Sequence, residues 1–532
     1  MAAASANPHL AAILEASATR FPERTAVVSP DGSSVTYRQL NDQADRIAAF
    51  LVRRGVQPGD RVGILIPKSK ESVIAIFGIL KARAAYVPAD YTAPAARLRS
   101  IFADCQLRAI FIYSGVLNVL TEASPEARPE TIVALGCTAA DARARGLDGA
   151  MDWETVLAEK GSVDTSASRS LDDLAFILYT SGSTGIPKGV MLSQRNATSL
   201  TAWASSVYQP TEDDRFSNHP PFHFDMSVQD LYPALQHGAA LFIVSEDLGK
   251  DPRKLALFIS ENRLTIWYST PSILTLLAEY GNLRKLSLDS LRIVGFAGES
   301  FPVKHLRKLV DLLPHPAYYN FYGPTETNVC TFARVPTPVP PDRTEPFPIG
   351  SACYHCTPLV LDANRNALTP GEEGLLYISG PSVSLGYWNR PQENAAAFLE
   401  RDGRRWYNTG DVVREDPTEG FIYLGRRDRM VKRRGFRIEL DDVQSGLYRH
   451  KGLREVAVIA VPDADSGVKI VAYLSAHAPD NKPSIIELKT FCNQELPAYM
   501  SPDVFIFLDA LPRTSTDKVN FPALQAAFLE GK

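Results

Sequence analysis

The chain has 532 residues, of which 45% are hydrophobic and 22% are charged. This is ordinary globular usage with ample length for a sizeable core, so it excludes a disulfide-stapled miniprotein and a wholly disordered chain. The net charge is −4, from 56 basic and 60 acidic residues, which leaves no global basic field to bind nucleic acid. The longest apolar runs are shorter than the roughly 18 residues that span a bilayer. We therefore expect neither a nucleic-acid-binding protein nor a membrane protein.

The two ends of the chain and its cysteines favour a cytoplasmic location. The N-terminus has no basic segment before its apolar residues and no glycine for myristoylation, and the C-terminus has no prenylation cysteine. The six cysteines are scattered along the chain, unlike a disulfide framework, and we expect them to be reduced. Cys353 and Cys356 form a CxxC pair, but the sequence has no second pair and no histidine cluster at zinc spacing. Two ordinary cysteines are therefore favoured over a metal site.

Short runs rich in β-branched and aromatic residues alternate with segments of helical periodicity. A helix is expected over Ser72–Ala85, where Val73, Ile76 and Leu80 recur at helical spacing. The expected strands are Arg61–Ile66, Ala109–Tyr113, Thr131–Leu135, Leu174–Tyr179, Ala240–Val244, Leu264–Tyr268, Leu291–Phe296 and Ala317–Phe321. This alternation predicts an α/β fold of layered, mostly parallel sheets and helices, whose functional loops follow the carboxyl ends of strands.

A domain boundary is expected at the basic stretch Gly425–Gly435. The Pro-rich stretch Val335–Phe347 is a weaker candidate because strand-like sequence resumes at once, and we interpret it as a surface loop. The tail after the basic stretch is long enough for a small α+β domain. Its expected elements are a helix with Leu440, Val443 and Leu447 on one face, strands Val456–Val461 and Ile470–Leu474, and a helix from Ser484. We predict a large N-terminal region, residues 1–425, and a small mobile C-terminal α+β domain, residues 426–532.

The segment after the expected strand Leu174–Tyr179 combines glycines, hydroxyls and one lysine. Glycines let backbone amides approach an anion, hydroxyls donate to its oxygens and lysine adds positive charge, so the segment suits a polyphosphate better than a flexible linker. Lys188 is followed by glycine instead of Ser or Thr, so this is not the GxxxxGK[ST] loop of P-loop NTPases. The candidate phosphate-binding residues are Thr180, Ser181, Gly182, Ser183, Thr184, Gly185 and Lys188.

With this loop and the motifs that follow it, the sequence resembles the adenylate-forming superfamily of acyl-CoA synthetases, luciferases and nonribosomal peptide synthetase adenylation domains. The motifs occur in family order over nearly the whole chain, so chance is a poor explanation. They are YTSGSTGIPKGV (Tyr179–Val190), FDMSV (Phe224–Val228), NFYGPTET (Asn320–Thr327), GYWNRP (Gly386–Pro391), YNTGD (Tyr407–Asp411), GRRDRMVKRRGFRIE (Gly425–Glu439) and LPRTSTDKVN (Leu511–Asn520). The segments FDMSVQDLYPAL and AGESFP look especially like stand-alone ligases that load alanine or proline onto carrier proteins.

The resemblance implies that ATP activates a carboxylate, which brings two anionic groups together. One unit-charge repulsion at about 4 Å is on the order of 4 kcal/mol at an effective dielectric near 20, so cations must be supplied. By the resemblance, Glu326 holds Mg²⁺, Thr325 contacts the α-phosphate, and Lys518 bridges phosphate and carboxylate oxygens. Catalysis would then be transition-state electrostatics without a covalent nucleophile. Asp517 replaces the usual glycine beside the lysine, and its effect on rate stays open.

The same resemblance implies how the nucleotide binds. Tyr322 would stack on adenine, and Asn320 would hydrogen-bond its exocyclic amine. Asp411 would accept from the ribose hydroxyls with help from Arg426, because one carboxylate can accept from two vicinal hydroxyls. The remaining nucleotide contacts implied by the family are Gly298, Phe321 and Gly323.

A hinge is implied at Asp428. In the family the C-terminal domain swings about this residue after adenylation, so that a thiol-acceptor tunnel near Gly435 replaces Lys518 at the site. One active site would then form the acyl-adenylate and afterwards the thioester. The basic run Lys432–Arg434 has two interpretations that stay open: an ordinary solvated run, or contacts to a phosphopantetheine phosphate or an acidic carrier protein.

Asp225 discriminates between substrate classes. In amino-acid-activating relatives an aspartate at this position pairs with the substrate α-ammonium, whereas a fatty-acyl or aryl substrate would leave it unpaired. The alternative role is a helix N-terminal cap. The pocket residues that the resemblance adds are Met226, Gln229, Tyr268, Gly295, Ala297, Phe321, Val329 and Cys330. None of these carries a formal charge, so we predict a small or medium neutral amino acid, with alanine or proline ahead of glycine and serine.

Fourteen residues follow Lys518, too few for a carrier domain, so we expect a separate carrier protein as acceptor, with coenzyme A second. The predicted function is activation of the amino acid as aminoacyl-AMP, with ATP and Mg²⁺, and transfer to the phosphopantetheine thiol of that carrier. An acyl- or aryl-CoA ligase is the rival enzyme, and a catalytically silent carrier-binding subunit is the rival from another class. The presence of Glu326, Asp411 and Lys518 argues against the silent subunit.

Overall fold

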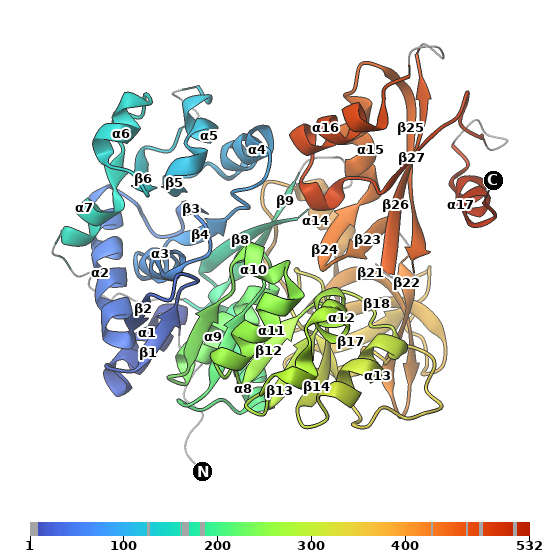
Figure 1. Cartoon of the computed structure of the whole chain (residues 1–532), viewed down its shortest axis with the longest axis horizontal. Helices are drawn as coiled ribbons and strands as arrows, with labels where there is room; N and C mark the ends of the chain where they lie inside the picture. Colours follow the sequence, from blue (N-terminus) through green and yellow to red (C-terminus); the bar gives the residue numbers. More distant parts are fainter. Residues whose placement is uncertain are drawn as a thin grey trace.

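The computed structural model of the chain describes residues 9–124, 128–159, 161, 170–180, 187–426, 429–463, 467–477, 482–513 and 519–531. Within these ranges the chain forms a large N-terminal region of sheets and helices, with a smaller C-terminal part beside it (Figure 1). The fold is mixed α/β, as the alternating sequence pattern predicts. The exact boundary between residues 425 and 426 stays a prediction. Among the described helices, none is both long and apolar enough to cross a bilayer.

The first N-terminal sheet contains the strands on either side of the candidate phosphate loop. Its order is β19-β9-β8-β4-β3-β5-β6-β7, with parallel pairing from β8 to β7 and antiparallel pairing of β9 with β8 and β19. The strands are β3 (Arg61–Leu65), β4 (Ala85–Pro88), β5 (Ala109–Tyr113), β6 (Thr131–Leu135), β7 (Met151–Asp152), β8 (Leu174–Thr180), β9 (Lys188–Ser193) and β19 (Gly386–Tyr387). Thr180 and Lys188, at the facing ends of β8 and β9, pair directly.

The second N-terminal sheet delivers most of the site residues. Its order is β16-β15-β14-β13-β12-β10-β11-β1-β2, parallel from β14 to β1 and antiparallel at both edges. The strands are β1 (Thr25–Val28), β2 (Ser34–Thr36), β10 (Arg215–Asn218), β11 (Ala240–Ile243), β12 (Ile266–Ser269), β13 (Ile293–Phe296), β14 (Ala317–Tyr322), β15 (Thr331–Val335) and β16 (Ser351–Ala352). Because β12, β13 and β14 are parallel neighbours, the residues after their carboxyl ends meet at one edge.

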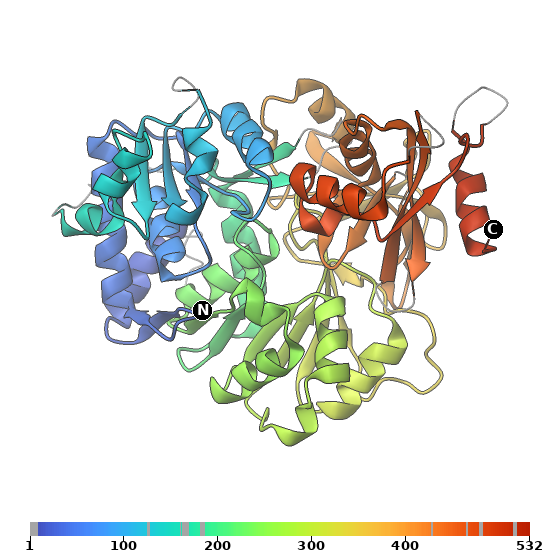
Figure 2. The same cartoon turned by 45° about the horizontal axis from the view of Figure 1, so that its top comes forward.

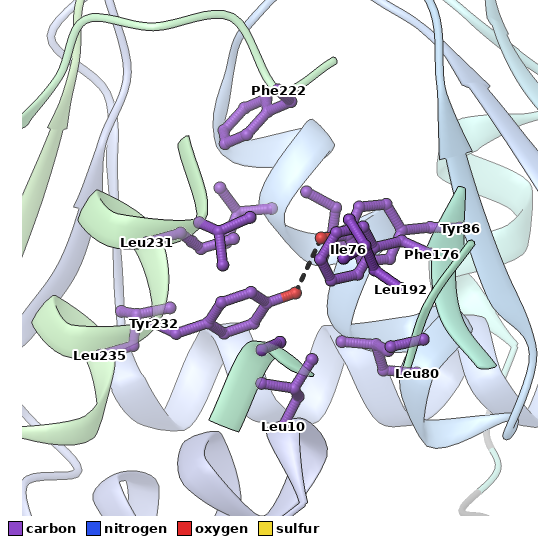
Figure 3. Packing of buried hydrophobic residues seen from close by; sticks show 14 of the residues in the cluster. Leu10, Ile76, Leu80, Tyr86, Phe176, Leu192, Phe222, Leu231, Tyr232 and Leu235 are labelled. Carbon is purple, nitrogen blue, oxygen red and sulfur yellow. Dashed lines mark hydrogen bonds between the residues drawn. The ribbon is translucent and has the colours of Figure 1, made fainter. Parts of the chain in front are cut away.

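Helices fill the space between these sheets and cover their outer faces. Helices α1, α2, α3, α8 and α9 share one apolar cluster with both sheets. Figure 3 shows its centre, where the hydroxyls of Tyr232 in α9 and Tyr86 in β4 hydrogen-bond at 3.0 Å among Leu10, Ile76 and Phe176. Helices α4 to α6 cover the outer face of the first sheet, and α10 to α13 cover that of the second.

The helices of this region have the following bounds. They are α1 (Leu10–Arg20), α2 (Tyr37–Arg53), α3 (Lys70–Lys81), α4 (Ala95–Cys105), α5 (Asn118–Thr121), α6 (Ala139–Ala144), α7 (Trp153–Ala158), α8 (Gln194–Tyr208), α9 (Met226–Gln236), α10 (Glu246–Gly249), α11 (Pro252–Glu261), α12 (Pro271–Tyr280), α13 (Val303–Leu312) and α14 (Pro391–Ala397).

A third sheet brings Asp411 and Arg426 together. It has the order β17-β18-β21-β20, and β22 pairs with β21. The strands are β17 (Thr357–Leu361), β18 (Glu373–Ser379), β20 (Phe398–Arg401), β21 (Arg404–Asp416) and β22 (Gly420–Arg426). The antiparallel register of β21 and β22 sets Asp411 directly opposite Arg426.

Among its described residues, the C-terminal part contains a hairpin, a small sheet and the α-helices α15 to α17; Figure 2 shows this part beside the N-terminal region. The hairpin is β23 (Met430–Arg433) with β24 (Phe436–Glu439), and the sheet is β25 (Leu453–Asp463), β26 (Gly467–Ala476) and β27 (Val504–Phe507). Helices α15 (Leu440–Tyr448) and α16 (Ile485–Glu495) share an apolar cluster with one set of side chains of the sheet. Helix α17 (Phe521–Leu529) packs in a separate cluster with the remaining apolar side chains of β25 and β26. Side chains alternate along β25 between the two clusters, so the helices cover opposite faces.

The expected strands are confirmed, each to within two residues at either end. The expected C-terminal helices and strands are also present, and Ser484 caps α16. The expected helix Ser72–Ala85 is wrong at its end: α3 stops at Lys81, and Ala85 already belongs to β4. Arg83 has a φ of 62°, which is a left-handed conformation that ends the helix. Glycine is the usual residue in this conformation, so the sequence gives no signal for the end.

Candidate active site

A cavity of ≈ 90 Å³ lies where α9, the second sheet and the C-terminal hairpin meet. Segments from the N-terminal region line one side of it, and Met430, Lys432 and Gly435–Arg437 of the hairpin line the other. The sequence-predicted residues at this cavity are Thr180, Asp225, Met226, Gln229, Tyr268, Ala297, Gly298, Gly323, Thr325 and Val329. The structure thus brings together residues that are dispersed over about half of the chain.

The position of Asp225 is compatible with both roles that the sequence left open. It is the residue before α9, and its Oδ1 accepts from the Met226 backbone N–H at 3.0 Å, while the side chain also lines the cavity. Burial raises the pKa of Asp225 to about 6, and the Lys432 ammonium opposes that rise. A carboxyl that burial makes costly to ionise gains most from a cationic ligand.

Aromatic packing fixes the wall of the cavity. The ring of Phe321 stands edge-on to Tyr268 with centroids 5.6 Å apart, and the Gln229 amide donates to the buried Tyr208 hydroxyl at 2.6 Å. A Cβ on Gly295 would lie 2.6 Å from the Phe321 ring, so glycine leaves room for that aromatic side chain. Of the predicted pocket residues, Gly295, Phe321 and Cys330 do not line the cavity.

A larger cleft of ≈ 1020 Å³ adjoins this cavity, since Gly298, Met430 and Lys432 line both. Its lining includes the nucleotide candidates Gly298, Asn320, Phe321, Tyr322 and Arg426. Asp411 lies behind this lining, fully buried. Its carboxylate accepts from the Tyr322 hydroxyl and pairs with Arg426 at 2.7 Å.

Glu326 is fully buried in a cluster of charged and phenolic groups. Its carboxylate pairs with Nη1 of Arg437 at 3.0 and 3.1 Å, and accepts from the Tyr387 hydroxyl at 2.6 Å. Burial opposes ionisation, but Arg437 and the Tyr387 hydrogen bond hold the pKa of Glu326 at about 2. A carboxylate that stays ionised fits the oxygen chemistry of Mg²⁺, although a guanidinium now lies on both oxygens.

Some predicted residues lie outside the described part of the chain. These are Ser181, Gly182, Ser183, Thr184, Gly185, Asp428 and Lys518. The described neighbours of the lysine are Arg513 and Val519, which bridge each other, and Arg513 pairs with Glu455 of β25. Neither Arg513 nor Val519 lines the cavity or the cleft.

Three contacts of the C-terminal part were not assigned from the sequence. The Gly435 backbone N–H donates to Oε1 of Glu299 at 2.9 Å, Phe436 meets Phe224 with ring centroids 4.9 Å apart, and Arg437 pairs with Glu326. The motif Gly425–Glu439 contains Gly435, Phe436 and Arg437. It indicated that this segment is functional, but it did not indicate which residues the segment contacts. Those partners are more than a hundred positions away, and no local pattern identifies them.

Residues 14–388 match the AMP-binding enzyme family, and residues 442–518 match the AMP-binding enzyme C-terminal domain. The chain belongs to this family of ATP-using, adenylate-forming enzymes. It is 39% identical to an L-proline–[L-prolyl-carrier protein] ligase of Pseudomonas fluorescens, over 96% of this chain and 97% of the relative. It is 36% identical to a ligase of the same name from Streptomyces coelicolor, over 98% and 97%. With relatives of this kind, the chain is an amino-acid-adenylating enzyme.

Solved structures agree with the fold. The Vibrio cholerae adenylation domain AlmE, in complex with glycyl-adenosine-5′-phosphate, matches with a TM-score of 0.83 and 25% identity over 98% of both chains. An artificially fused adenylation and carrier didomain from Klebsiella oxytoca matches with a TM-score of 0.80 and 24% identity, over 93% of both chains. At 24% identity, the similarity to the Klebsiella oxytoca didomain supports the fold alone.

Proposed function

We propose that the enzyme activates proline with ATP and transfers the prolyl group to the phosphopantetheine thiol of a separate carrier protein. The observation that carries this proposal is the Asp225 carboxyl in an otherwise neutral part of the cavity wall. The names of the two relatives described above support proline and a carrier protein. Alanine is the second candidate substrate and coenzyme A the second candidate acceptor.

The choice of substrate follows from charge and size. Of the described N-terminal residues that line the cavity, Asp225 is the acid, and the rest are neutral at neutral pH because burial lowers the pKa of His223. An ammonium would pair with Asp225, while a second cation on the substrate side chain would be buried without an acid of its own to pair with. The apolar ring of proline suits the neighbouring Met226, Tyr268 and Val329.

In the first half-reaction, a substrate carboxylate oxygen attacks the α-phosphorus of ATP, and pyrophosphate leaves. Asp225 would hold the ammonium, Tyr322 would cover adenine, and Arg426 with Asp411 would orient the ribose. Glu326 is the residue that would hold Mg²⁺, which when bound supplies positive charge to the phosphates. Lys518 would stabilise the charge that develops between phosphate and carboxylate.

In the second half-reaction, the carrier thiol attacks the acyl carbon of the aminoacyl-AMP, a thioester forms, and AMP leaves. Gly435 and Phe436, which line the cavity from the C-terminal side, would border the approach of the thiol. Removal of Lys518 from the site between the two half-reactions would need rotation at the proposed hinge Asp428.

The test is ATP–pyrophosphate exchange against the twenty amino acids and D-proline, with fatty and aryl acids included. We expect L-proline to give the highest rate, with alanine next. Preference for lysine, glutamate or a fatty acid would refute the pocket argument, and absence of exchange with every acid would support a silent subunit. Loading of a prolyl group onto a phosphopantetheinylated carrier, compared with coenzyme A, then identifies the acceptor.

A further inference from the structure

A groove of ≈ 820 Å³ lies where α8 meets the third sheet, and it shares no lining residue with the cavity or the cleft of the active site. We call it the arginine groove. It is lined by residues of α8, of the loop before β17, of the end of β18 and of the start of β21. These residues are Leu171, Arg195, Ser199, Ala202, Tyr354, His355, Thr357, Ser379, Gly380, Pro381, Val383, Arg404 and Arg405.

The charged residues of this lining are three arginines, and none of the lining residues is acidic. Arg195 is paired outside the groove with Asp172 at 2.8 Å. The guanidinium of Arg405 lies over the Phe398 ring at 3.9 Å, which holds it in place without using its N–H donors. Arg404 is exposed. Because each guanidinium has five N–H donors, the groove offers several of them to a ligand.

His355 is the buried polar member of the lining. It is 7% exposed, and neither of its ring nitrogens has a hydrogen-bond partner among the described protein atoms. Burial lowers the pKa of His355 to about 4, although the Val329 backbone opposes the shift, so the ring is neutral and carries one N–H. Buried polar groups are nearly always hydrogen-bonded in folded proteins. The groove is where an acceptor from outside the protein can reach this ring.

We propose that the arginine groove binds the phosphate group of a small molecule, with His355, Arg404 and Arg405 as its donors. A phosphate presents three or more acceptor oxygens and up to two negative charges, and it matches the fork of an arginine bidentately. A carboxylate has two oxygens and one charge, so it would satisfy fewer of these donors. The exposed ring of Tyr354 also lines the groove and offers an apolar face to an organic group on the phosphate.

A row of packed rings extends from this groove toward the amino-acid cavity. The ring centroids of His355 and Trp203 are 5.9 Å apart, and those of Trp203 and Phe321 are 5.6 Å apart. Phe321 in turn packs against Tyr268 of the cavity wall. A ligand on His355 therefore binds next to a buried tryptophan, whose fluorescence supplies a second signal. The proposal does not depend on which amino acid the enzyme activates.

The experiment is NMR of the full chain labelled with [¹³Cε1]histidine, at pH 7 and constant ionic strength. His355→Gln identifies the His355 resonance by its loss. Inorganic phosphate and phenyl phosphate should each shift this resonance to saturation, whereas acetate and chloride should leave it in place. Tighter binding of phenyl phosphate would identify a phosphate monoester as the ligand, and equal or weaker binding would identify free phosphate. His223, which lines the amino-acid cavity, reports any binding there.

Arg404→Gln tests the donors of the groove. Loss of a charge-assisted hydrogen bond should raise the phosphate concentration at half-maximal shift about ten-fold. Arg404→Lys keeps the charge without the fork and should restore part of the affinity. Arg401→Gln is the matched control, because Arg401 lies on the neighbouring β20 and does not line the groove. It should keep the wild-type midpoint, and unchanged resonances of the other histidines would show that each variant is folded.

Three results would overturn the inference. The first is a His355 resonance that neither phosphate moves at up to about 20 mM, where a site of millimolar affinity would be nearly saturated. The second is a shift of the same size with acetate, which would mean a general effect of anions. The third is an unchanged midpoint in a folded Arg404→Gln protein. A true site should also change Trp203 emission with the same midpoint, and Trp203→Phe should remove that change.

Discussion

The amino-acid cavity and the nucleotide cleft differ in how their walls are held. Tyr268 and Gln229 of the cavity wall are fixed by contacts within the buried N-terminal core, where Tyr268 packs against the Phe321 ring and Gln229 bonds to Tyr208. The hairpin β23–β24 lines both spaces, but in the cleft its residues Met430, Val431 and Lys432 lie beside the groups proposed to bind the nucleotide. Selection of the substrate is thus assigned to a rigid wall, and nucleotide chemistry to groups that must change partners. Substitutions in the two regions should accordingly affect different kinetic constants.

The largest effect is expected for Asp225→Asn. Loss of the carboxylate would leave the substrate ammonium buried without its counter-charge, a cost of about 3 to 5 kcal/mol, so kcat/KM for proline should fall by roughly 10² to 10⁴. The KM for ATP should change little. Pyrophosphate exchange with each substrate varied in turn measures both.

Asp230→Asn provides a matched control on the same helix. Asp230 is buried one turn along α9, does not line the cavity, and burial raises its pKa well above the usual range. Because burial favours the protonated form of this carboxyl, an amide of the same shape should leave kcat/KM for proline near the wild-type value. Equal losses in both variants would mean that α9, and not the Asp225 charge, is responsible.

The next effect is expected for Lys518→Ala. Removal of a key transition-state contact typically costs about 10² in rate, so aminoacyl-AMP formation should slow by that factor. Thioester formation from supplied prolyl-AMP should continue, since the lysine is proposed to leave the site for that step. Lys489→Ala, at an exposed lysine of α16, should affect neither. An unchanged adenylation rate in Lys518→Ala would remove this lysine from the mechanism.

The fold was predictable where a local pattern reports burial directly. The strands Ala109–Tyr113 and Thr131–Leu135 match to the residue because both are continuous apolar runs inside a parallel sheet. The end of α3 was not predictable, because Ala82 and Ala84 continue the apolar pattern while Arg83, a residue without a turn preference, leaves the helix.

The site residues also differ in whether the sequence could predict their positions. Asp225 and Thr325 could be placed from their motifs, and the structure brings both to one cavity. The partner of Arg437 could not be placed, because its pairing with Glu326 joins segments 111 positions apart and depends on how the C-terminal part docks. Sequence motifs therefore identify candidate groups for the site, but not which contacts these groups make across the fold.

The smallest expected effect is a pH dependence that belongs to the cavity and not to the cleft. Asp225 must be ionised to hold the ammonium, and burial raises its pKa to about 6. Between pH 7 and pH 5 its ionised fraction falls about ten-fold, so KM for proline should rise by a similar factor as pH falls. Glu326, with a pKa of about 2, stays ionised throughout, and KM for ATP should therefore stay level.

Substrate affinity and folding stability should depend on pH in opposite directions. An acid whose pKa is raised in the native state destabilises the fold as pH rises between its unfolded and its folded pKa. Ionisation of Asp225 should therefore make the protein without substrate slightly less stable as pH rises from 4 to 7. Over the same range the affinity for the substrate should increase. Asp225→Asn should abolish the KM slope and flatten the stability change. Exchange kinetics and thermal unfolding at pH 5, 6 and 7 measure the two, and a proline KM that stays level in the wild type would mean that another group holds the ammonium.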